Sequence, residues 1–368
     1  MAQQAERTLQ EALAAFDFGG SVTDAARYGE GHINDTFLVN GGAERFILQR
    51  VSSAAFKEPD KLMENIVNVT DYLGREIQRQ GGNPRRETLT VIRTRQGENS
   101  FTDSQGGVWR VFPFVEGTVC YQAAETPQLF AASGRAFGRF QRLLRDYPAH
   151  TLHETIPHFH DTEDRLRKFK EAVAADLLGR AADCQADIGF VLAREADCSA
   201  ALSAQREGAL PLRVTHNDTK LNNVLMDAAT GEALCVIDLD TVMPGLSIND
   251  FGDSIRFGAN HNAEDEPDLS KVNFDIDLFS VYTAAFLGEA GEALTPAEIR
   301  YLPWGAKLMT LECGMRFLTD HLEGDSYFHI SRPGQNLDRA RTQFKLVADM
   351  EAQWDQMNAI VAKYIKAD

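Results

Sequence analysis

The strongest constraint on the fold is a change of sequence pattern near residue 116. Before it, short runs of Phe, Ile, Leu and Val alternate with turns that carry Gly and Asn, which is typical of antiparallel strands. After it, apolar residues recur at helical spacing over long stretches. A chain of 368 residues rarely forms one core. We therefore predict an α+β protein with an antiparallel-sheet domain, residues 1–116, and a larger, mainly helical domain, residues 117–368.

Periodicity and turn residues also predict the individual elements. In the first domain we expect helices over residues 4–16 and 59–75 and strands within residues 28–39, 44–51, 89–94 and 108–115. In the second domain we expect helices over residues 126–145, 161–178, 187–205, 274–288, 295–320 and 338–365. Two strand-like stretches, residues 212–215 and 234–239, interrupt these helices, with Gly231 in the turn between them.

Charge and hydropathy limit the class of partner. The net charge is −17, from 37 Lys and Arg against 54 Asp and Glu, and such a field repels nucleic-acid backbones and anionic lipid surfaces. No run approaches the roughly 18 consecutive apolar residues of a membrane helix. The five cysteines form no CxxC pair, which favours reduced, buried thiols. We expect a cytoplasmic protein, monomeric or weakly dimeric, that binds small molecules rather than nucleic acid or membrane.

The motif that carries chemistry is HNDTKLNN at residues 216–223, followed by the apolar strand that ends in Asp238. Phosphoryl transfer needs a carboxylate that accepts or orients a hydroxyl proton, and an amide and a second carboxylate that hold magnesium. Asp218, Asn223 and Asp238 provide these groups in chain order. The alternative is a polar loop in which His216 and Asp218 only bind backbone groups.

Several segments resemble the aminoglycoside phosphotransferase-like (choline kinase-like) small-molecule kinases, and most closely their N-acetylhexosamine 1-kinase subfamily. They are GHINDTF (31–37), FILQRV (46–51), LHETIPHFH (152–160), VTHNDTKLNNVL (214–225), VIDLDTVMPG (236–245) and DFGDSIRFGAN (250–260). The resemblance implies a protein-kinase-like two-lobe fold, with ATP and Mg²⁺ as cofactors. It also implies phosphorylation of the anomeric hydroxyl of an N-acetylhexosamine, GlcNAc or GalNAc.

The same resemblance assigns roles to individual residues. Asp218 is the catalytic base, and Asn223 and Asp238 are the magnesium ligands. The nucleotide-binding residues lie on a phosphate loop, on the third strand or at the hinge to the second lobe: Gly29, Gly31, Asn34, Arg50, Pro113 and Val115. The substrate-binding residues are His32, Phe257, Arg316, Tyr327 and Trp354. From the residues alone, a hairpin turn at Gly29, an edge strand ending at Pro113 and a core position for Phe257 or Trp354 remain open.

The third strand departs from the family pattern. Kinases usually carry a lysine there that contacts the nucleotide phosphates and pairs with a helix glutamate, but this strand reads Leu48-Gln49-Arg50. Either Arg50 supplies the cation or Gln49 bonds without charge, and the two are not equivalent. Glu64 is the candidate partner on the following helix, with a solvated helix face as the alternative.

Other residues are candidates for metal binding or for a segment that covers the sugar site. Asp250-Phe251-Gly252 spells a magnesium motif of protein kinases but follows no apolar strand, so we expect Asp250 and Asp253 to brace the catalytic loop. Asp240 is either an auxiliary ligand or an exposed carboxylate. The four histidines at 150, 153, 158 and 160 lack the spacing of a zinc site. The acidic run at residues 264–266 is most simply a solvated loop, with a mobile cover over the sugar as the alternative.

Two competing functions remain open. The chain could be a related kinase for an aminoglycoside, homoserine, choline or another sugar. It could also be a nucleotide-binding pseudokinase, a reading that the missing lysine encourages and that Asp218, Asn223 and Asp238 oppose.

Overall fold

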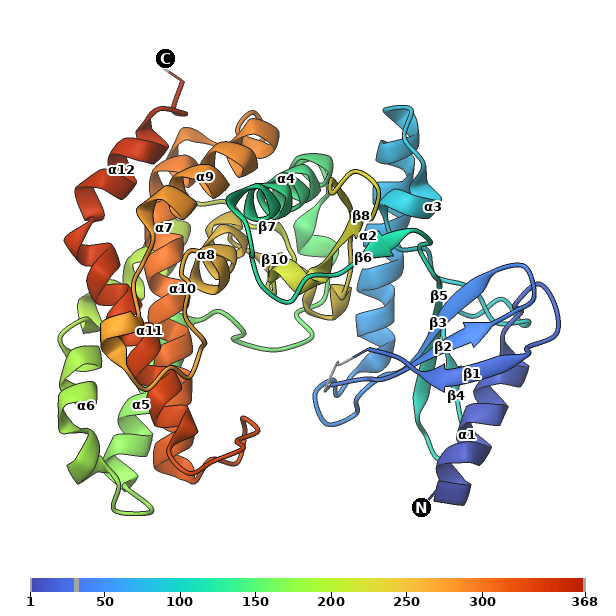
Figure 1. Ribbon diagram of the computed structural model, residues 1–368, viewed down its shortest axis with the longest axis horizontal. Coiled ribbons are helices and arrows are strands. Elements are labelled where there is room, and N and C mark those ends of the chain that lie inside the picture. Colours follow the sequence, from blue (N-terminus) through green and yellow to red (C-terminus); the bar gives the residue numbers. More distant parts are fainter. Residues whose placement is uncertain (1, 30–32, 367–368) are drawn as a thin grey trace. The chain divides into compact units, whose positions relative to one another are not determined.

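The computed structural model describes residues 2–29 and 33–366 and divides into two compact units (Figure 1). The sheet unit comprises residues 1–119, 150–156 and 225–243, and the helical unit comprises residues 120–149, 157–224 and 244–368. An antiparallel sheet therefore dominates one unit and helices dominate the other, as the sequence predicted.

The sheet unit contains a five-stranded antiparallel sheet in the order β1-β2-β3-β5-β4. Its strands are β1 (Asp24–Arg27), β2 (Asp35–Asn40), β3 (Arg45–Arg50), β4 (Phe101–Thr102) and β5 (Val108–Pro113). Its helices are α1 (Ala2–Ala15), α2 (Pro59–Arg79) and α3 (Pro84–Glu87). Alternate residues of a strand point to opposite faces. One face packs Leu48, Trp109 and Val111 against Phe16 and Phe18, next to α1.

The prediction of a strand over residues 89–94 is wrong. Only single bridges form there, between Ile92 and Val111 and between Thr94 and Phe16. The chain reverses at Gly97, where the Thr94 amide donates to the carbonyl of Glu98. Because of this turn, two short segments share the edge beside β5, and the second of them is β4.

A smaller sheet in the same unit has the order β6-β8-β9, with strands β6 (Thr118–Val119), β8 (Val224–Asp227) and β9 (Ala233–Val236). The sequence analysis predicted no strand at β8. The turn at Gly231 therefore joins β8 to β9, and not residues 212–215 to residues 234–239 as predicted. On α2, the buried Asn65 side chain donates to the carbonyls of His153 and Val242 and accepts from the His153 amide. One amide therefore holds three distant segments of the unit together.

The helical unit carries the remaining helices (Figure 1). They are α4 (Pro127–Leu143), α5 (Thr162–Ala175), α6 (Gln185–Leu192), α7 (Ala200–Arg206), α8 (Ser247–Gly258), α9 (Ile276–Ala290), α10 (Pro296–Glu323), α11 (Gln335–Ala352) and α12 (Trp354–Ala362). The other strands are β7 (Arg213–Thr215) and β10 (Met243–Gly245). Short 3-10 turns occur in both units: η1 (Ala149–Thr151), η2 (Ala181–Cys184), η3 (Glu195–Ser199), η4 (Leu221–Asn223), η5 (Leu239–Thr241) and η6 (Leu269–Lys271).

Two predicted helices are interrupted. The helix expected over residues 187–205 breaks at Arg194, whose guanidinium binds Glu351 and the Phe190 carbonyl. The helix expected over residues 338–365 breaks at Gln353. Apolar periodicity continues across both breaks, so the pattern could not reveal them.

Helix α8 packs directly on α10 through glycine. A Cβ on Gly252 would overlap the backbone carbonyl of Gly305, and one on Gly305 would overlap that of Ile248. The two backbones can touch only because both positions lack a side chain. This contact fixes α8, the helix whose carboxylates bind the loop after β7.

Candidate active site

The loop after β7 is held by a carboxylate from α8. Asn217 has a left-handed backbone with φ of 66°, a conformation that Asn tolerates better than most residues. The Asp250 carboxylate accepts hydrogen bonds from the backbone amides of His216, at 2.9 Å, and Asn217, at 2.8 Å. Gln141 of α4 donates to the same carboxylate at 2.7 Å.

Asp253 braces the next part of the loop. Its carboxylate accepts from the Thr219 amide at 2.9 Å and from the Arg256 guanidinium. The hydroxyl of Ser254 donates to the Thr219 carbonyl, at 2.8 Å, so α8 binds this residue on both its backbone groups. The expectation that Asp250 and Asp253 support the loop is confirmed.

Burial and charge act differently on these two carboxylates. Burial raises the pKa of Asp250, against the opposing effects of His216 and the three donors. Burial would also raise the pKa of Asp253, but the charges of Arg256, Lys220 and His160 hold that pKa below its usual value. Asp253 is therefore the anionic counterpart of the cations around the loop.

At the end of the loop, Asp218 is bound by two neighbours. The Asn223 side-chain amide donates to the Asp218 carbonyl at 2.8 Å and to its carboxylate at 3.1 Å. The Lys220 ammonium lies 2.8 Å from the other carboxylate oxygen. Burial opposes the charge of Lys220, but Asp218 and Asp253 together raise the pKa of its ammonium. A cation thus lies beside the predicted base.

In the sheet unit, Asp238 occupies the turn after β9 with a left-handed backbone, φ 59°. Such conformations in non-glycine residues are uncommon and gather at functional sites. Two residues later, Asp240 is buried and binds the Arg110 guanidinium at 2.5 Å and the Asn34 amide at 2.7 Å. Of the two alternatives for Asp240, the exposed carboxylate is wrong: the side chain is buried, with one oxygen in an ion pair with Arg110 and the other accepting from Asn34.

The two candidates on the third strand point to opposite faces of the sheet. Arg50 shares the face of Leu48 and Trp109, and its Nε lies 3.6 Å from Asp103. Gln49 faces the other way, where its side-chain oxygen accepts from the Arg110 guanidinium at 2.9 and 3.0 Å. Glu64 pairs with His153 at 2.9 Å. The structure therefore brings Gln49, not Arg50, to Arg110, the ion-pair partner of Asp240.

The other predicted nucleotide contacts lie in the same unit. Gly29 has φ of 77°, which favours glycine, and Gly31 and His32 lie outside the described residues. The ring of Tyr28, just before this glycine, meets that of Phe114 edge-on at 5.8 Å. Pro113 is the last residue of β5 and Val115 is buried beyond it. The segment before the loop thus contacts the segment predicted as the hinge.

The predicted substrate residues do not all lie together. The Arg316 guanidinium is 3.5 Å from the Tyr327 hydroxyl and 5.7 Å from the centre of its ring. Phe257 follows Arg256 at the end of α8. Trp354 instead packs on Trp304, at 5.2 Å between rings. Since Trp304 lies twelve residues before Arg316 on α10, about 18 Å along the helix axis, Trp354 is remote from Arg316.

The four histidines have different partners, among them Glu64 for His153, Asp161 for His158 and Glu312 for His160. The acidic run is not simply solvated. Glu264 pairs with Arg256, Asp265 with Arg332 and Glu266 with Lys271. These pairs attach the run to α8 and to the segment before α11.

The residues proposed for magnesium have suitable atoms. Mg²⁺ prefers carboxylate, amide and phosphate oxygens. Because Asn223 donates through its nitrogen to Asp218, its amide oxygen is the atom left to accept a metal ion. Asp238, in the sheet unit, has a carboxylate of the kind that Mg²⁺ prefers. Within residues 2–29 and 33–366, no three His, Cys, Asp or Glu side chains form a metal-binding group. A magnesium site completed by phosphate oxygens does not need such a group.

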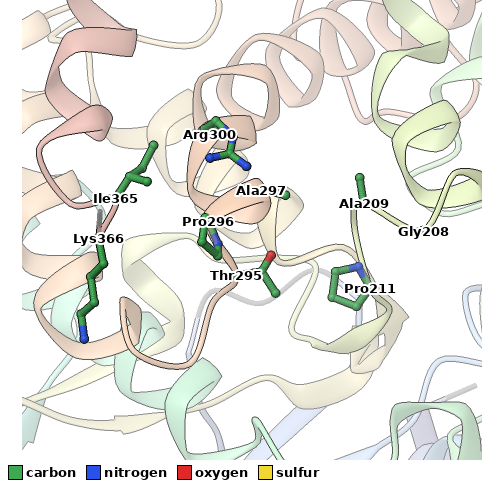
Figure 2. A pocket seen from close by; sticks show the side chains of 9 residues that line it. All are labelled: Gly208, Ala209, Pro211, Thr295, Pro296, Ala297, Arg300, Ile365 and Lys366. Carbon is green, nitrogen blue, oxygen red and sulfur yellow. The ribbon is translucent and has the colours of Figure 1, made fainter. Parts of the chain in front are cut away.

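Three further features are a pocket, the cysteines and the hydropathy of the helices. Figure 2 shows a pocket of about 540 Å³ in the helical unit. It is lined by Gly208, Ala209, Pro211, Thr295, Pro296, Ala297, Arg300, Ile365 and Lys366. The five cysteines are free thiols, but Cys120 is exposed, against the expectation of burial. Across the described residues, no helix combines the length and apolarity that a membrane span requires.

Comparison with known proteins identifies the family. The profile of the phosphotransferase enzyme family (APH) matches residues 24–280, and the chain belongs to this family. Fold and family together define a phosphotransferase of the small-molecule kinase class.

Solved structures agree with the fold. A microcompartment-associated aminopropanol kinase is 17% identical, with coverage of 96% of this chain and 98% of that chain and a TM-score of 0.59. A choline/ethanolamine kinase family protein from Mesorhizobium loti is 19% identical, with coverage of 97% and 99% and a TM-score of 0.55. A spectinomycin phosphotransferase in complex with ADP and spectinomycin is 12% identical, with coverage of 95% and 98% and a TM-score of 0.57. The expected protein-kinase-like fold is confirmed.

The sequence analysis did not predict three residues that form ion pairs or hydrogen bonds in and around the site. Lys220 lies inside the motif HNDTKLNN, and its position two residues after Asp218 was the available signal. Arg110 is a single charge within an apolar strand, which marks a buried ion pair. Glu312, which binds His160 and Thr162, lies on a long helix without any local signal.

Proposed function

We propose that the protein is an ATP- and magnesium-dependent kinase that phosphorylates the anomeric hydroxyl of an N-acetylhexosamine, GlcNAc or GalNAc, to the 1-phosphate. The observation that carries the proposal is the arrangement of Asp218. Its carboxylate is held by Asn223 and Lys220 at the end of a loop whose backbone is fixed by α8. A carboxylate in such a position can orient a hydroxyl and accept its proton.

In the proposed reaction, Asp218 takes the proton of the anomeric hydroxyl as the sugar oxygen forms a bond to the γ-phosphorus. The bond from that phosphorus to the bridging oxygen breaks, and ADP leaves with the electron pair. A hemiacetal hydroxyl is more acidic than an ordinary alcohol, so a carboxylate of modest basicity suffices. Lys220 adds positive charge near the transferred group, which stabilises its oxygens.

Asn223 and Asp238 are the proposed magnesium ligands, through an amide and a carboxylate oxygen. Held there, a magnesium ion would neutralise negative charge that develops on the transferred phosphoryl group. On the nucleotide side, we assign the loop at Gly29 to the phosphates and the backbone after Pro113 to the base. The contact of Tyr28 with Phe114 supports this assignment, because it joins these two segments.

The sugar assignment rests on the motif resemblance and on the Arg316 and Tyr327 pair. A guanidinium and a phenol hydroxyl can together donate and accept hydrogen bonds with ring hydroxyls or an acetamido carbonyl. Phe257 would provide an apolar surface. Trp354 has less support, because it packs elsewhere on α10.

The test is a coupled assay of ADP release with ATP and Mg²⁺ over N-acetylhexosamines, unmodified hexoses, amino alcohols, homoserine and aminoglycosides. We expect turnover with an N-acetylhexosamine, and phosphorus NMR of the product should show a 1-phosphate. Asp218→Asn is the matched control and should lose most of this turnover while it remains folded.

Other outcomes identify the alternatives. Turnover only with amino alcohols or aminoglycosides would retain the kinase and reject the sugar. Nucleotide binding without turnover on any acceptor would indicate a pseudokinase.

A further inference from the structure

The absent third-strand lysine leaves the sheet unit without its usual cation near the nucleotide phosphates. A cation is nevertheless present on the neighbouring strand. Arg110 of β5 lies directly opposite Gln49 of β3 in the strand register, and its guanidinium points to the same face of the sheet as the Gln49 side chain. Arg110 is 2% exposed, so it is enclosed by protein rather than presented to solvent.

Arg110 is connected to two segments of the proposed nucleotide site, the turn that carries Asp238 and the end of the phosphate loop at Asn34. Its Nε and one terminal nitrogen donate to Gln49, and the other terminal nitrogen lies 2.5 Å from Asp240. Asp240 is two residues after Asp238, the proposed magnesium ligand. Its second oxygen accepts from the Asn34 side chain at 2.7 Å. Asn34 in turn accepts from the Ser52 amide at 2.9 Å, so its side chain is fixed at both ends.

Such a pair is costly to bury. Both charged groups lose their hydration, and a protein with apolar residues of similar volume in their place would often be equally stable or more stable. Arg110 also lies over the Phe112 ring of its own strand. The polar side chains of the network, however, come from the end of the proposed phosphate loop, the turn that carries Asp238 and the third strand, which points to a task beyond packing. The guanidinium suits this task, because two of its nitrogens donate to Gln49 while the third forms an ion pair with Asp240. An ammonium is instead a single point charge.

We propose that Arg110 and Asp240 form a positioning pair that fixes the turn carrying Asp238 against the Asn34 end of the phosphate loop, in place of the third-strand lysine. Arg110 acts through Asp240 and does not touch the nucleotide. Gln49 holds the guanidinium in the required orientation. This inference rests on the proposed function for the roles of Asp238 and of the phosphate loop.

The test is a double-mutant cycle of Arg110→Met and Asp240→Asn, with kcat and KM for ATP at saturating Mg²⁺ as readouts. We expect each single variant to raise KM for ATP about tenfold, with a smaller change in kcat, and the double variant to be no worse than the worse single variant. Arg79→Met is the matched control, because Arg79 is an exposed helix residue paired with Glu76, and its KM should equal that of the wild type.

Several results would overturn the positioning role. If Arg110→Met raises KM while Asp240→Asn does not, Arg110 acts without Asp240. If both single variants lower kcat and leave KM for ATP unchanged, the substitutions only reduce the fraction of folded protein. If Arg110→Met does not fold, Gln49→Met tests the same point with both charges kept, and an unchanged KM for ATP rejects the proposal.

Calorimetric titration of the wild type with ATP and Mg²⁺ separates this inference from the proposed function. Binding in the wild type with unaltered KM in the variants rejects the positioning pair alone. No binding in the wild type rejects both.

Discussion

The carboxylate of Asp250 accepts a hydrogen bond from the backbone amide of Asn217, the residue before the proposed base Asp218. A left-handed residue is thereby held in place by an acceptor from another element. The geometry of Asp218 thus depends on a side chain that is fully buried and takes no part in the chemistry.

Asp250→Asn should lower kcat while the protein remains folded. An amide has one accepting oxygen, so one of the two loop N–H groups would face a donor and the loop would move. A displacement of 1 Å can cost about 100-fold in rate, and we expect a loss of this order. Steady-state ADP release measures it, with Asp146→Asn, an exposed carboxylate, as control. Equal rates in the two variants would show that the brace is dispensable.

Glu298→Gln should destabilise the whole helical unit. Glu298 is buried, binds Arg213 of β7 at 2.6 and 2.7 Å, accepts from Ser247 and completes the capping box of α10. Removal of one partner from a buried pair costs about 3–5 kcal/mol. Denaturant unfolding measures this loss, and Glu171→Gln, an exposed carboxylate, should change stability little.

The same residue gives a pH dependence. Burial would raise the pKa of Glu298, but the Arg213 ion pair and the other hydrogen bonds hold it below the usual value. Its contribution is therefore present above the unfolded pKa, about 4.3, and is lost as pH falls through the lower folded pKa. Acidification should destabilise the wild type more than Glu298→Gln. Parallel pH curves for the two proteins would contradict this.

Local sequence information predicted the carboxylates that brace the loop and little of the long-range contacts around it. The motif HNDTKLNN and the position of Asp250 after it were enough to expect a loop braced by carboxylates. The Arg110 network was not predictable in this way, because Gln49, Arg110 and Asp240 meet only after distant strands pair. The only sign of this network in the sequence is Arg110 itself, a charged residue within an apolar strand.

Element boundaries failed for a related reason. The breaks at Arg194 and Gln353 are stabilised by contacts with remote segments, Glu351 and the Phe274 carbonyl. Periodicity reports which residues face the core, and that face continues across both breaks. Similarly, a turn at Gly97 places two segments, the bridge at Ile92 and strand β4, along the same edge of the main sheet. Strand propensity alone does not predict this turn.

Lys220→Met should lower kcat by about 100-fold, the scale of losing one group that stabilises transition-state charge. The ammonium lies 2.8 Å from Asp218, and its raised pKa keeps it charged throughout the neutral and moderately alkaline range. A pH–rate profile should therefore show no recovery of the variant at any pH. Lys220→Arg keeps the charge and should retain more activity; if both variants match the wild type, Lys220 has no role in the reaction.

The free energy of unfolding should decrease as pH rises, because His160 loses its proton. Its two ring nitrogens face acceptors, Glu312 and the Asn217 carbonyl, each at 3.1 Å, so only the doubly protonated ring satisfies both. Burial opposes this charge, but Glu312, the Asn217 carbonyl and Asp253 raise the pKa of His160. The contribution is complete below the unfolded pKa, about 6.5, and is lost as pH rises through the higher folded pKa.

Melting temperatures of the wild type and His160→Gln between pH 6 and 9 test this. The difference between the two proteins should be largest at the acid end and shrink with rising pH. His158→Gln, at an exposed position, is the control. A difference that is constant with pH would show that the ring is held neutral.

Tyr327→Phe and Trp354→Phe separate substrate contact from packing. The Tyr327 hydroxyl lies beside Arg316 and the side chain is 72% exposed, so its loss should raise KM for the sugar by about the worth of one hydrogen bond, two- to tenfold. Trp354 packs on Trp304 and beside the Lys307 ammonium, so Trp354→Phe should lower the melting temperature and leave this KM unchanged. A larger rise of KM in Trp354→Phe than in Tyr327→Phe would instead assign Trp354 to the sugar.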